Sequence, residues 1–312
     1  MSEEKNKGRI ALWICVCAVV TAIIGILEFY LGRNILYEIF IANPFYERYV
    51  KYQPRPMSTQ FNPVILGSYV LGCLPFGLFL FRSKPLYLRL LGIFSSLLCL
   101  VIIFLTASRG VFLGLIALSL FYLWKRQKRR LIFLFLTCLI ALVSICSFLA
   151  DANLNRFGFE RLISGSYDSI VSEYRLSRVK MTAKILKDYP FFGIGFNHFR
   201  LRFNEYCPEK DRGKVLNEFM IPDNMYLTFL AEAGITGALG FLIFISLIFK
   251  RGFQRIRETE NNDKRHFLII SMSALAGLLM NMGAYELFYW HNPYMFFCLL
   301  CGFVGLDEKY SR

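Results

Sequence analysis

The sequence predicts an all-α polytopic membrane protein with about eight transmembrane helices and one long extracytoplasmic loop that contains an amphipathic helix. Of its 312 residues, 56% are hydrophobic and only 19% are charged, whereas soluble domains carry about 25% charged residues. The apolar residues gather in runs close to the ~20 residues that cross a bilayer. The basic residues, which give a net charge of +14, fall mostly between these runs. This composition excludes an ordinary soluble enzyme, a disordered chain and a secreted disulfide scaffold.

Eight apolar runs are the expected transmembrane helices. They are residues 10–31, 64–81, 86–106, 108–124, 131–150, 224–249, 267–286 and 289–306. The fourth run is short, and aromatic and polar residues crowd the start of the last one. Seven spans or a re-entrant C-terminal end therefore remain as alternatives. The first run is too long for a cleavable signal peptide and has no small-residue cleavage site.

The whole chain, residues 1–312, is expected to form a single membrane domain. Five spans lie in 10–150, the loop is 151–223, and three spans lie in 224–306. The tails and the short loops on one side of these spans hold nineteen Lys and Arg residues. Because short basic loops stay in the cytoplasm, we expect both termini there and the long loop outside.

The long loop carries twelve basic residues and one predicted helix, residues 173–188. Apolar residues recur along this helix at Leu176, Val179, Ala183 and Leu186. A neighbouring stripe holds Arg175, Arg178 and Thr182. A helix of this kind would lie flat on the outer leaflet. It serves either to anchor the loop at the membrane interface or as a cationic surface that binds a lipid phosphate.

Arg109 stands between two apolar runs with almost no polar residues around it. A charge so close to the hydrocarbon is costly and tends to be functional. The planar guanidinium suits bidentate binding of phosphate. The alternative is that Arg109 extends to the membrane surface from a helix end.

Two acidic residues mark the point where the long loop re-enters the membrane. Asp223 follows a proline and precedes an apolar helix, so it is either a base at the bilayer edge or an ordinary N-cap. Glu232 lies nine residues further, where it either makes a polar contact between helices or lines a cavity. A transporter would be expected to have paired charges at the membrane midplane or broken helices in matched halves. The sequence shows only Glu28, Glu232 and Glu286 within or near the expected spans, and no internal repeat.

Histidines and cysteines give weaker signals. His198 and His291 are expected on the outer side, where either is a candidate base, and His266 is expected to be solvated in a cytoplasmic basic stretch. Cys207 is the one cysteine in the long loop, and we expect it to react with an impermeant maleimide. Cys298 and Cys301 have metal-ligand spacing but lie in an apolar run without a second pair, and no cluster of His, Asp and Glu has such spacing. We therefore expect no metal and no cofactor.

The order of these elements resembles the O-antigen ligase/polymerase family of bacterial membrane glycosyltransferases. The resemblance covers roughly residues 55–306. The matching pieces are the Arg-Pro-Met-Ser-Thr-Gln-Phe-Asn-Pro run of 55–63, Ser-Arg-Gly of 108–110 with Gly114, Arg175 on the loop helix, Pro-Phe-Phe-Gly-Ile-Gly of 190–195, and Asp-Asn-Met-Tyr-Leu of 223–227 with Glu-Ala-Gly-Ile-Thr-Gly of 232–237. Placed around one outer loop, they make the match fairly specific.

The resemblance implies an enzyme of the bacterial inner (plasma) membrane. Such enzymes transfer a glycan from an undecaprenyl-diphosphate carrier to a glycan, lipid or protein acceptor, as surface polysaccharide polymerases or O-antigen-type ligases, without metal or nucleic acid. It implies that Arg109 and Arg175 bind the diphosphate and that the position of Asp223 holds the base. We also expect Arg178, Asn224, Glu232 and His198 to bind the substrate.

The sequence departs from this family at the position of the base. Asp223 stands where a histidine is usual, so either the carboxylate acts, or His198 or His291 supplies the imidazole, or the chain is inactive. Family members also commonly have ten or more spans. The competing functions are a transporter or flippase for lipid-linked glycan and an inactive homologue that binds the carrier lipid.

Overall fold

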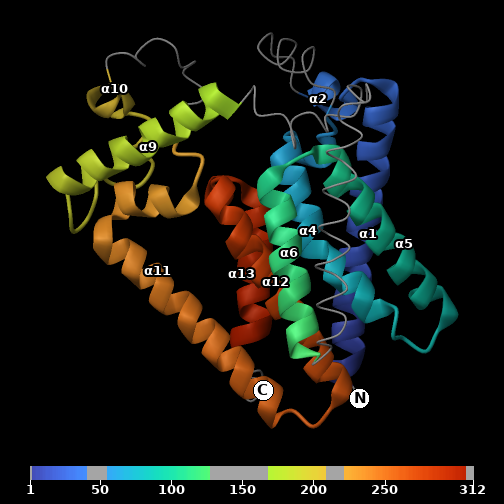
Figure 1. Ribbon diagram of the computed structural model, residues 1–312. Helices are drawn as coiled ribbons and strands as arrows, with labels where there is room; N and C mark the ends of the chain where they lie inside the picture. The colour runs from blue at the N-terminus through green and yellow to red at the C-terminus, as the bar shows by residue number, and fades with distance from the viewer. Residues whose placement is uncertain (1, 41–54, 127–167, 209–220, 307–312) are drawn as a thin grey trace. The chain divides into compact units, whose positions relative to one another are not determined.

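The computed structural model describes residues 2–40, 55–126, 168–208 and 221–306, and every regular element in these ranges is a helix (Figure 1). The all-α prediction is confirmed for them. The expected span 131–150 lies outside the described residues. The chain divides into two compact units. Unit 1 is Met1–Ile163, Arg251–Asn281 and Trp290–Arg312, and unit 2 is Ser164–Lys250 and Met282–Tyr289.

The described helices of each unit have the following bounds. Those of unit 1 are α1 (Ser2–Leu31), α2 (Ile35–Phe40), η1 (Ser58–Gln60), α4 (Pro63–Leu80), α5 (Leu86–Thr106), α6 (Arg109–Lys125), α12 (Asn262–Asn281) and α13 (His291–Gly305). Those of unit 2 are α9 (Asp168–Asp188), α10 (Phe203–Tyr206), η6 (Met282–Ala284), η7 (Leu287–Tyr289) and α11 (Met225–Glu258), whose last turns belong to unit 1.

Five helices in the described ranges are long and apolar enough to cross a membrane: α1, α4, α5, α11 and α12 together with η6. The helices α6 and α13 match two further expected spans but have only 17 and 15 residues. The chain is thus a multi-pass membrane protein, and the total of eight spans stays a prediction.

Helix α4 is the centre of unit 1, where it packs on α1, α5, α6, α12 and α13 (Figure 1). The Asn62 side chain caps its first turn by accepting the amides of Val64 and Ile65 at 2.8 and 3.4 Å. Glycines bring the neighbours close, because a Cβ on Gly114 of α6 would lie 2.7 Å from the carbonyl oxygen of Gly277 of α12. Gly114 therefore serves helix packing.

The cytoplasmic basic stretch expected before the seventh span is mostly helical. Helix α11 continues to Glu258 and α12 begins at Asn262. The expectation of a solvated His266 is wrong, because its ring is buried against Phe79 and lies 3.3 Å from the Tyr122 hydroxyl. The cause is the earlier start of α12, which places this residue on the packed face of a helix.

Helix α9 confirms the predicted loop helix and shows which of its faces is packed. Arg178, Met181, Thr182 and Ile185 are buried, whereas Leu176 and Val179 are exposed. Cys207 lies in the same apolar core, with Phe199, Phe203 and Ala231. The expectation of a reactive Cys207 is therefore wrong, because the thiol is covered by this core.

The expected span at 224–249 lies in α11, which is long and apolar enough to cross a membrane, but the helix breaks at Gly234, whose backbone (φ 66°, ψ −166°) is not helical. Figure 1 shows a short first segment that turns into a long second one. The break unpairs two carbonyl groups before it and two amides after it, and the 190–195 turn supplies their partners. The bonds are Ile194 N to Ala231 O (2.9 Å), Gly195 N to Glu232 O (2.9 Å), Ile235 N to Pro190 O (2.9 Å) and Thr236 N to Phe191 O (3.2 Å). Two motifs that are distant in sequence thus complete each other's backbone hydrogen bonds.

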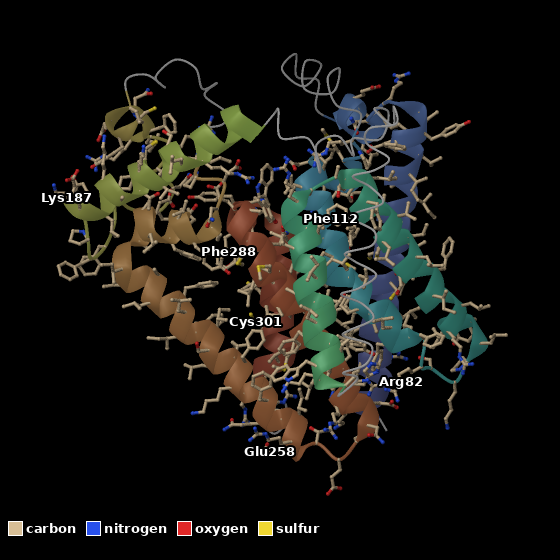
Figure 2. The ribbon with its side chains drawn as sticks, in the orientation of Figure 1. Arg82, Phe112, Lys187, Glu258, Phe288 and Cys301 are labelled. Atoms are coloured by element: carbon tan, nitrogen blue, oxygen red, sulfur yellow. The ribbon has the colours of Figure 1, made fainter. Side chains whose placement is uncertain are left out.

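Aromatic side chains fill the elbow that the break creates. The Phe229 ring of the first segment stacks on Phe241 of the second at 4.6 Å. Phe288 of η7, labelled in Figure 2, meets both rings edge-on at 5.5 and 5.8 Å. The break is therefore a packed part of unit 2.

We predict that Gly234→Ala destabilises the protein. A Cβ there would lie 2.7 Å from the Gly193 amide nitrogen, on a backbone conformation that only glycine adopts readily. The expected loss is about 1–3 kcal/mol or more, measured as a lower thermal midpoint of the detergent-solubilised protein. Gly240→Ala is the matched control, because this helical glycine of α11 faces open space. Equal midpoints for the two variants would contradict the prediction.

Candidate active site

Glu232 holds the 190–199 region of unit 2 together. One carboxylate oxygen accepts the Asn197 amide at 2.9 Å and the Tyr289 hydroxyl at 2.5 Å. The other accepts the Phe199 amide at 3.1 Å. The Phe196 ring stacks on Tyr289 at 5.9 Å. Glu232 thus makes the contacts of a positioning residue, and its predicted role in substrate binding stays a prediction.

The N-cap of α11 is Asn224. Its side-chain oxygen accepts the amides of Tyr226 and Leu227 at 2.9 and 3.2 Å, and its amide nitrogen donates to the Gly283 carbonyl at 2.8 Å. The alternative that Asp223 is the cap is therefore wrong. The reason is that Asp223 adopts a left-handed backbone (φ 57°), which leaves the capping position to the residue after it.

The backbone of Asp223 is hydrogen-bonded to Glu286, a residue that was not predicted to belong to the site. The Asp223 amide donates to Glu286 Oε1 at 3.1 Å, and the Thr228 hydroxyl donates to the same oxygen at 3.1 Å. Glu286 is 2% exposed and lies between η6 and η7, 63 residues further along the chain. The sequence feature that could have indicated Glu286 is its position as an acidic residue at the end of the apolar run 267–286.

Two arginines of α9 complete the cluster. Arg178 is 1% exposed, and its Nε donates to the Ile221 carbonyl. Arg175, one turn earlier, is exposed. The positive charges of both arginines lower the pKa of Asp223, and the charge of Arg178 also lowers that of Glu286. We call Arg175, Arg178, Asp223 and Glu286 the carboxyl–arginine cluster.

Burial sets the protonation of this cluster. Burial and, to a smaller extent, the nearby Asp223 raise the pKa of Glu286 to about 8, although hydrogen bonds from Thr228 and the Asp223 amide and the charge of Arg178 act against this. Burial also raises the pKa of Asp223, but Arg178 and Arg175 lower it in part. Burial lowers the pKa of Arg178 to about 10. At neutral pH, Glu286 is therefore mostly protonated and Arg178 is charged.

His198, Arg109 and His291 are the other predicted site residues. His198 is an exposed residue of unit 2, with Nδ1 2.8 Å from the Phe196 carbonyl oxygen. Arg109 and His291 are exposed and belong to unit 1, where they begin α6 and α13. In the described ranges, no three His, Cys, Asp or Glu side chains gather as metal ligands.

The protonation of Glu286 predicts a pH-dependent stability. Its pKa rises from 4.5 in the unfolded chain to about 8 in the folded one. Because folding favours the protonated form, its stabilising effect is complete below pH 4.5 and is lost as the pH rises towards 8. Glu286→Gln should flatten the fall of the thermal midpoint between pH 6 and pH 8. Glu205→Gln, at an exposed carboxylate of unit 2, is the control and should keep the wild-type slope. A wild-type slope in Glu286→Gln would refute this assignment.

A family model described as O-antigen ligase matches residues 94–242. This segment holds Arg109 and three of the four cluster residues, but Glu286 lies beyond it. Comparison with curated proteins gave no match. The resemblance predicted from the sequence is confirmed for residues 94–242, the part of the chain that is similar to the O-antigen ligase family.

Proposed function

We propose that the protein transfers a glycan from an undecaprenyl-diphosphate carrier to an acceptor hydroxyl at the outer leaflet of the bacterial inner membrane. The observation that carries the proposal is the carboxyl–arginine cluster, in which Asp223 lies beside a mostly neutral Glu286 and in the field of two arginines. The O-antigen ligase match of the surrounding segment supports the same reaction.

The arginines stabilise the leaving group. As the bond between the anomeric carbon and the phosphate oxygen breaks, its electron pair moves to the diphosphate, which becomes more negative. Arg175 is exposed and is the cluster's direct ligand for a phosphate oxygen. Arg178 is buried and contributes a fixed positive field, which is stronger away from water. The role of Arg109, which begins α6 in unit 1, stays a prediction.

Asp223 is the general base. It takes the proton of the acceptor hydroxyl while the acceptor oxygen bonds to the anomeric carbon, and the proton then passes to water. A single displacement of this kind inverts the anomeric centre. Glu286 holds the Asp223 backbone and, being mostly protonated at neutral pH, leaves the net charge of the cluster positive. This charge favours an anionic donor.

The other predicted substrate-binding residues divide into two kinds. The side chains of Asn224 and Glu232 form hydrogen bonds with backbone groups, and Glu232 also accepts one from Tyr289. We therefore propose that these two residues position the base and the 190–199 turn. The exposed His198 is the remaining candidate for contact with the glycan. Whether the acceptor is a growing polysaccharide, a lipid or a protein is a separate question that the glycan profile of a deletion strain answers.

The base assignment predicts a large loss of transfer in Asp223→Asn. This change keeps the size of the side chain but removes proton acceptance, so the rate should fall about 10²–10⁴-fold. Arg175→Lys should also be severe, because lysine lacks the planar fork that binds a phosphate group, whereas Arg200→Lys, at another exposed position of unit 2, should be near wild type. The measurement is glycan transfer in membranes, with a gel of surface glycan from a complemented deletion strain.

Several outcomes would contradict this assignment. An active Asp223→Asn enzyme together with an inactive His198→Gln or His291→Gln enzyme would move the base to an imidazole. Transport of lipid-linked glycan without transfer in any of these proteins would favour a flippase. Carrier binding without either activity would identify an inactive homologue.

The extracytoplasmic placement of α9 is tested by labelling. Lys187, labelled in Figure 2, is exposed near the end of this helix. In Lys187→Cys, an impermeant maleimide should react in intact cells, or in spheroplasts where an outer membrane is present. Asp263→Cys, exposed at the start of α12, should react only after the inner membrane is ruptured. The reverse pattern would invert the proposed topology. The wild-type chain measures the background, to which the buried Cys207 contributes little.

A further inference from the structure

Two phenylalanine side chains of unit 2 are exposed on a turn whose backbone is held in place. Phe191 is 64% exposed and Phe192 is 79% exposed. The Phe191 carbonyl accepts the amide of Thr236 at 3.2 Å and its hydroxyl at 2.6 Å. A Cβ on Gly193 would lie 2.5 Å from the Ala231 carbonyl oxygen, so the turn packs closely on the break of α11. The two rings are therefore directed outward from a fixed backbone, and the proposed reaction uses neither of them.

The turn adjoins the second segment of α11, which is exposed along its length (Figure 1). Only 11% of the most apolar stretch of this helix is buried. One stripe at i, i+4 spacing is 40–59% exposed and consists of Ile235, Leu239, Ile243 and Leu247. On a helix long and apolar enough to cross a membrane, such a stripe faces lipid. Because the Ile235 amide donates to the Pro190 carbonyl at 2.9 Å, the stripe ends next to Phe191.

The second segment by itself is shorter than the hydrocarbon core of a bilayer. Residues 235–249, between the break and Lys250, include no charged residue. At 1.5 Å per residue this stretch is about 22 Å long, whereas the hydrocarbon core is about 30 Å thick. Apolar groups beside Ile235 are therefore needed to extend the apolar band by about 8 Å. Phe191 and Phe192 lie at this end of the segment.

The residues at the edge of the turn suit the headgroup region. Tyr189 is 41% exposed, and the Arg202 guanidinium lies 5.3 Å from the centre of its ring. Lys187, two residues before Tyr189, is exposed. Tyrosine is enriched at the membrane interface, and basic side chains are attracted there by anionic phospholipid. The surface thus has an apolar tip and a cationic, aromatic edge, which is complementary to an anionic bilayer.

We propose that Phe191 and Phe192 form a membrane anchor, whose rings insert into the acyl chains of the adjoining leaflet while Tyr189, Arg202 and Lys187 contact phospholipid headgroups. In the proposed topology this is the outer leaflet. The anchor sets the depth at which the 190–195 turn, and with it unit 2, meets the bilayer. This inference does not depend on the transfer reaction.

The test measures the quenching of tryptophan fluorescence by lipid. The three native tryptophans are replaced by phenylalanine, and Phe192→Trp is added. The protein is placed in nanodiscs of phosphatidylcholine and phosphatidylglycerol, with or without bromine atoms on the acyl chains. Because bromine quenches tryptophan only at close contact, the brominated lipid should reduce the fluorescence of Phe192→Trp. Its emission should also lie at a shorter wavelength than that of tryptophan in water.

Matched variants set the scale for this measurement. Phe244→Trp, at a 45% exposed position of the second segment of α11, should be quenched by brominated lipid. Asn204→Trp, at an exposed position of α10, should be quenched by aqueous iodide instead. Adding Phe191→Asp to the Phe192→Trp protein should reduce quenching by lipid, because a carboxylate enters hydrocarbon only at a high cost. Thermal midpoints identify variants that fail to fold, and Phe191→Trp then replaces Phe192→Trp and should behave like it.

Each outcome decides the inference. Quenching of Phe192→Trp by brominated lipid, as in Phe244→Trp, supports the anchor. Quenching by iodide alone, as in Asn204→Trp, would place the rings in water and overturn it. Fluorescence that neither agent quenches would show that protein covers the rings, either another segment of this chain or a second copy, and would also overturn it. These results stand whatever Asp223→Asn does to transfer.

Discussion

The break of α11 at Gly234 is the constraint on which the rest of unit 2 depends. Apolar surroundings leave no water to satisfy unpaired backbone groups, so the groups that the break unpairs need partners within the protein. The 190–195 turn supplies them. This pairing places Glu232 where its carboxylate gathers the amides after the turn and the Tyr289 hydroxyl. The 282–289 segment is thereby joined to α11, and Glu286 comes to lie beside Asp223.

Three buried glutamates, each in one of the two units, accept hydrogen bonds from backbone amides of non-helical segments. Glu28 accepts two amides of the 57–58 backbone, Glu232 accepts two amides after the 190–195 turn, and Glu286 accepts the amide of the left-handed Asp223. Each carboxyl group thus fixes a non-helical segment next to a membrane helix. A transporter would need such charges for its cargo, whereas here they serve to hold backbone segments.

The carboxyl–arginine cluster shows how burial divides roles between residues of the same type. Arg175 and Arg178 lie one turn apart on α9, yet one is exposed and the other is fully covered. Asp223 and Glu286 are both carboxylic acids, yet the second is raised to a pKa of about 8 and is held by a hydroxyl and an amide. Differences in environment thus leave one arginine exposed and make the two carboxyl groups differ in protonation.

By itself, the sequence determined the all-helical membrane architecture, the α9 helix, the family resemblance and most of the cluster. These follow from local apolar periodicity and from short motifs. Only the tertiary structure decided that Asn224 is the cap of α11, that α11 breaks at Gly234, and that Glu286 joins Asp223. It also decided that the Arg178 face of α9 is buried while Leu176 is exposed. Periodicity defines the faces of a helix, but which face is covered depends on contacts between residues that are distant in the chain.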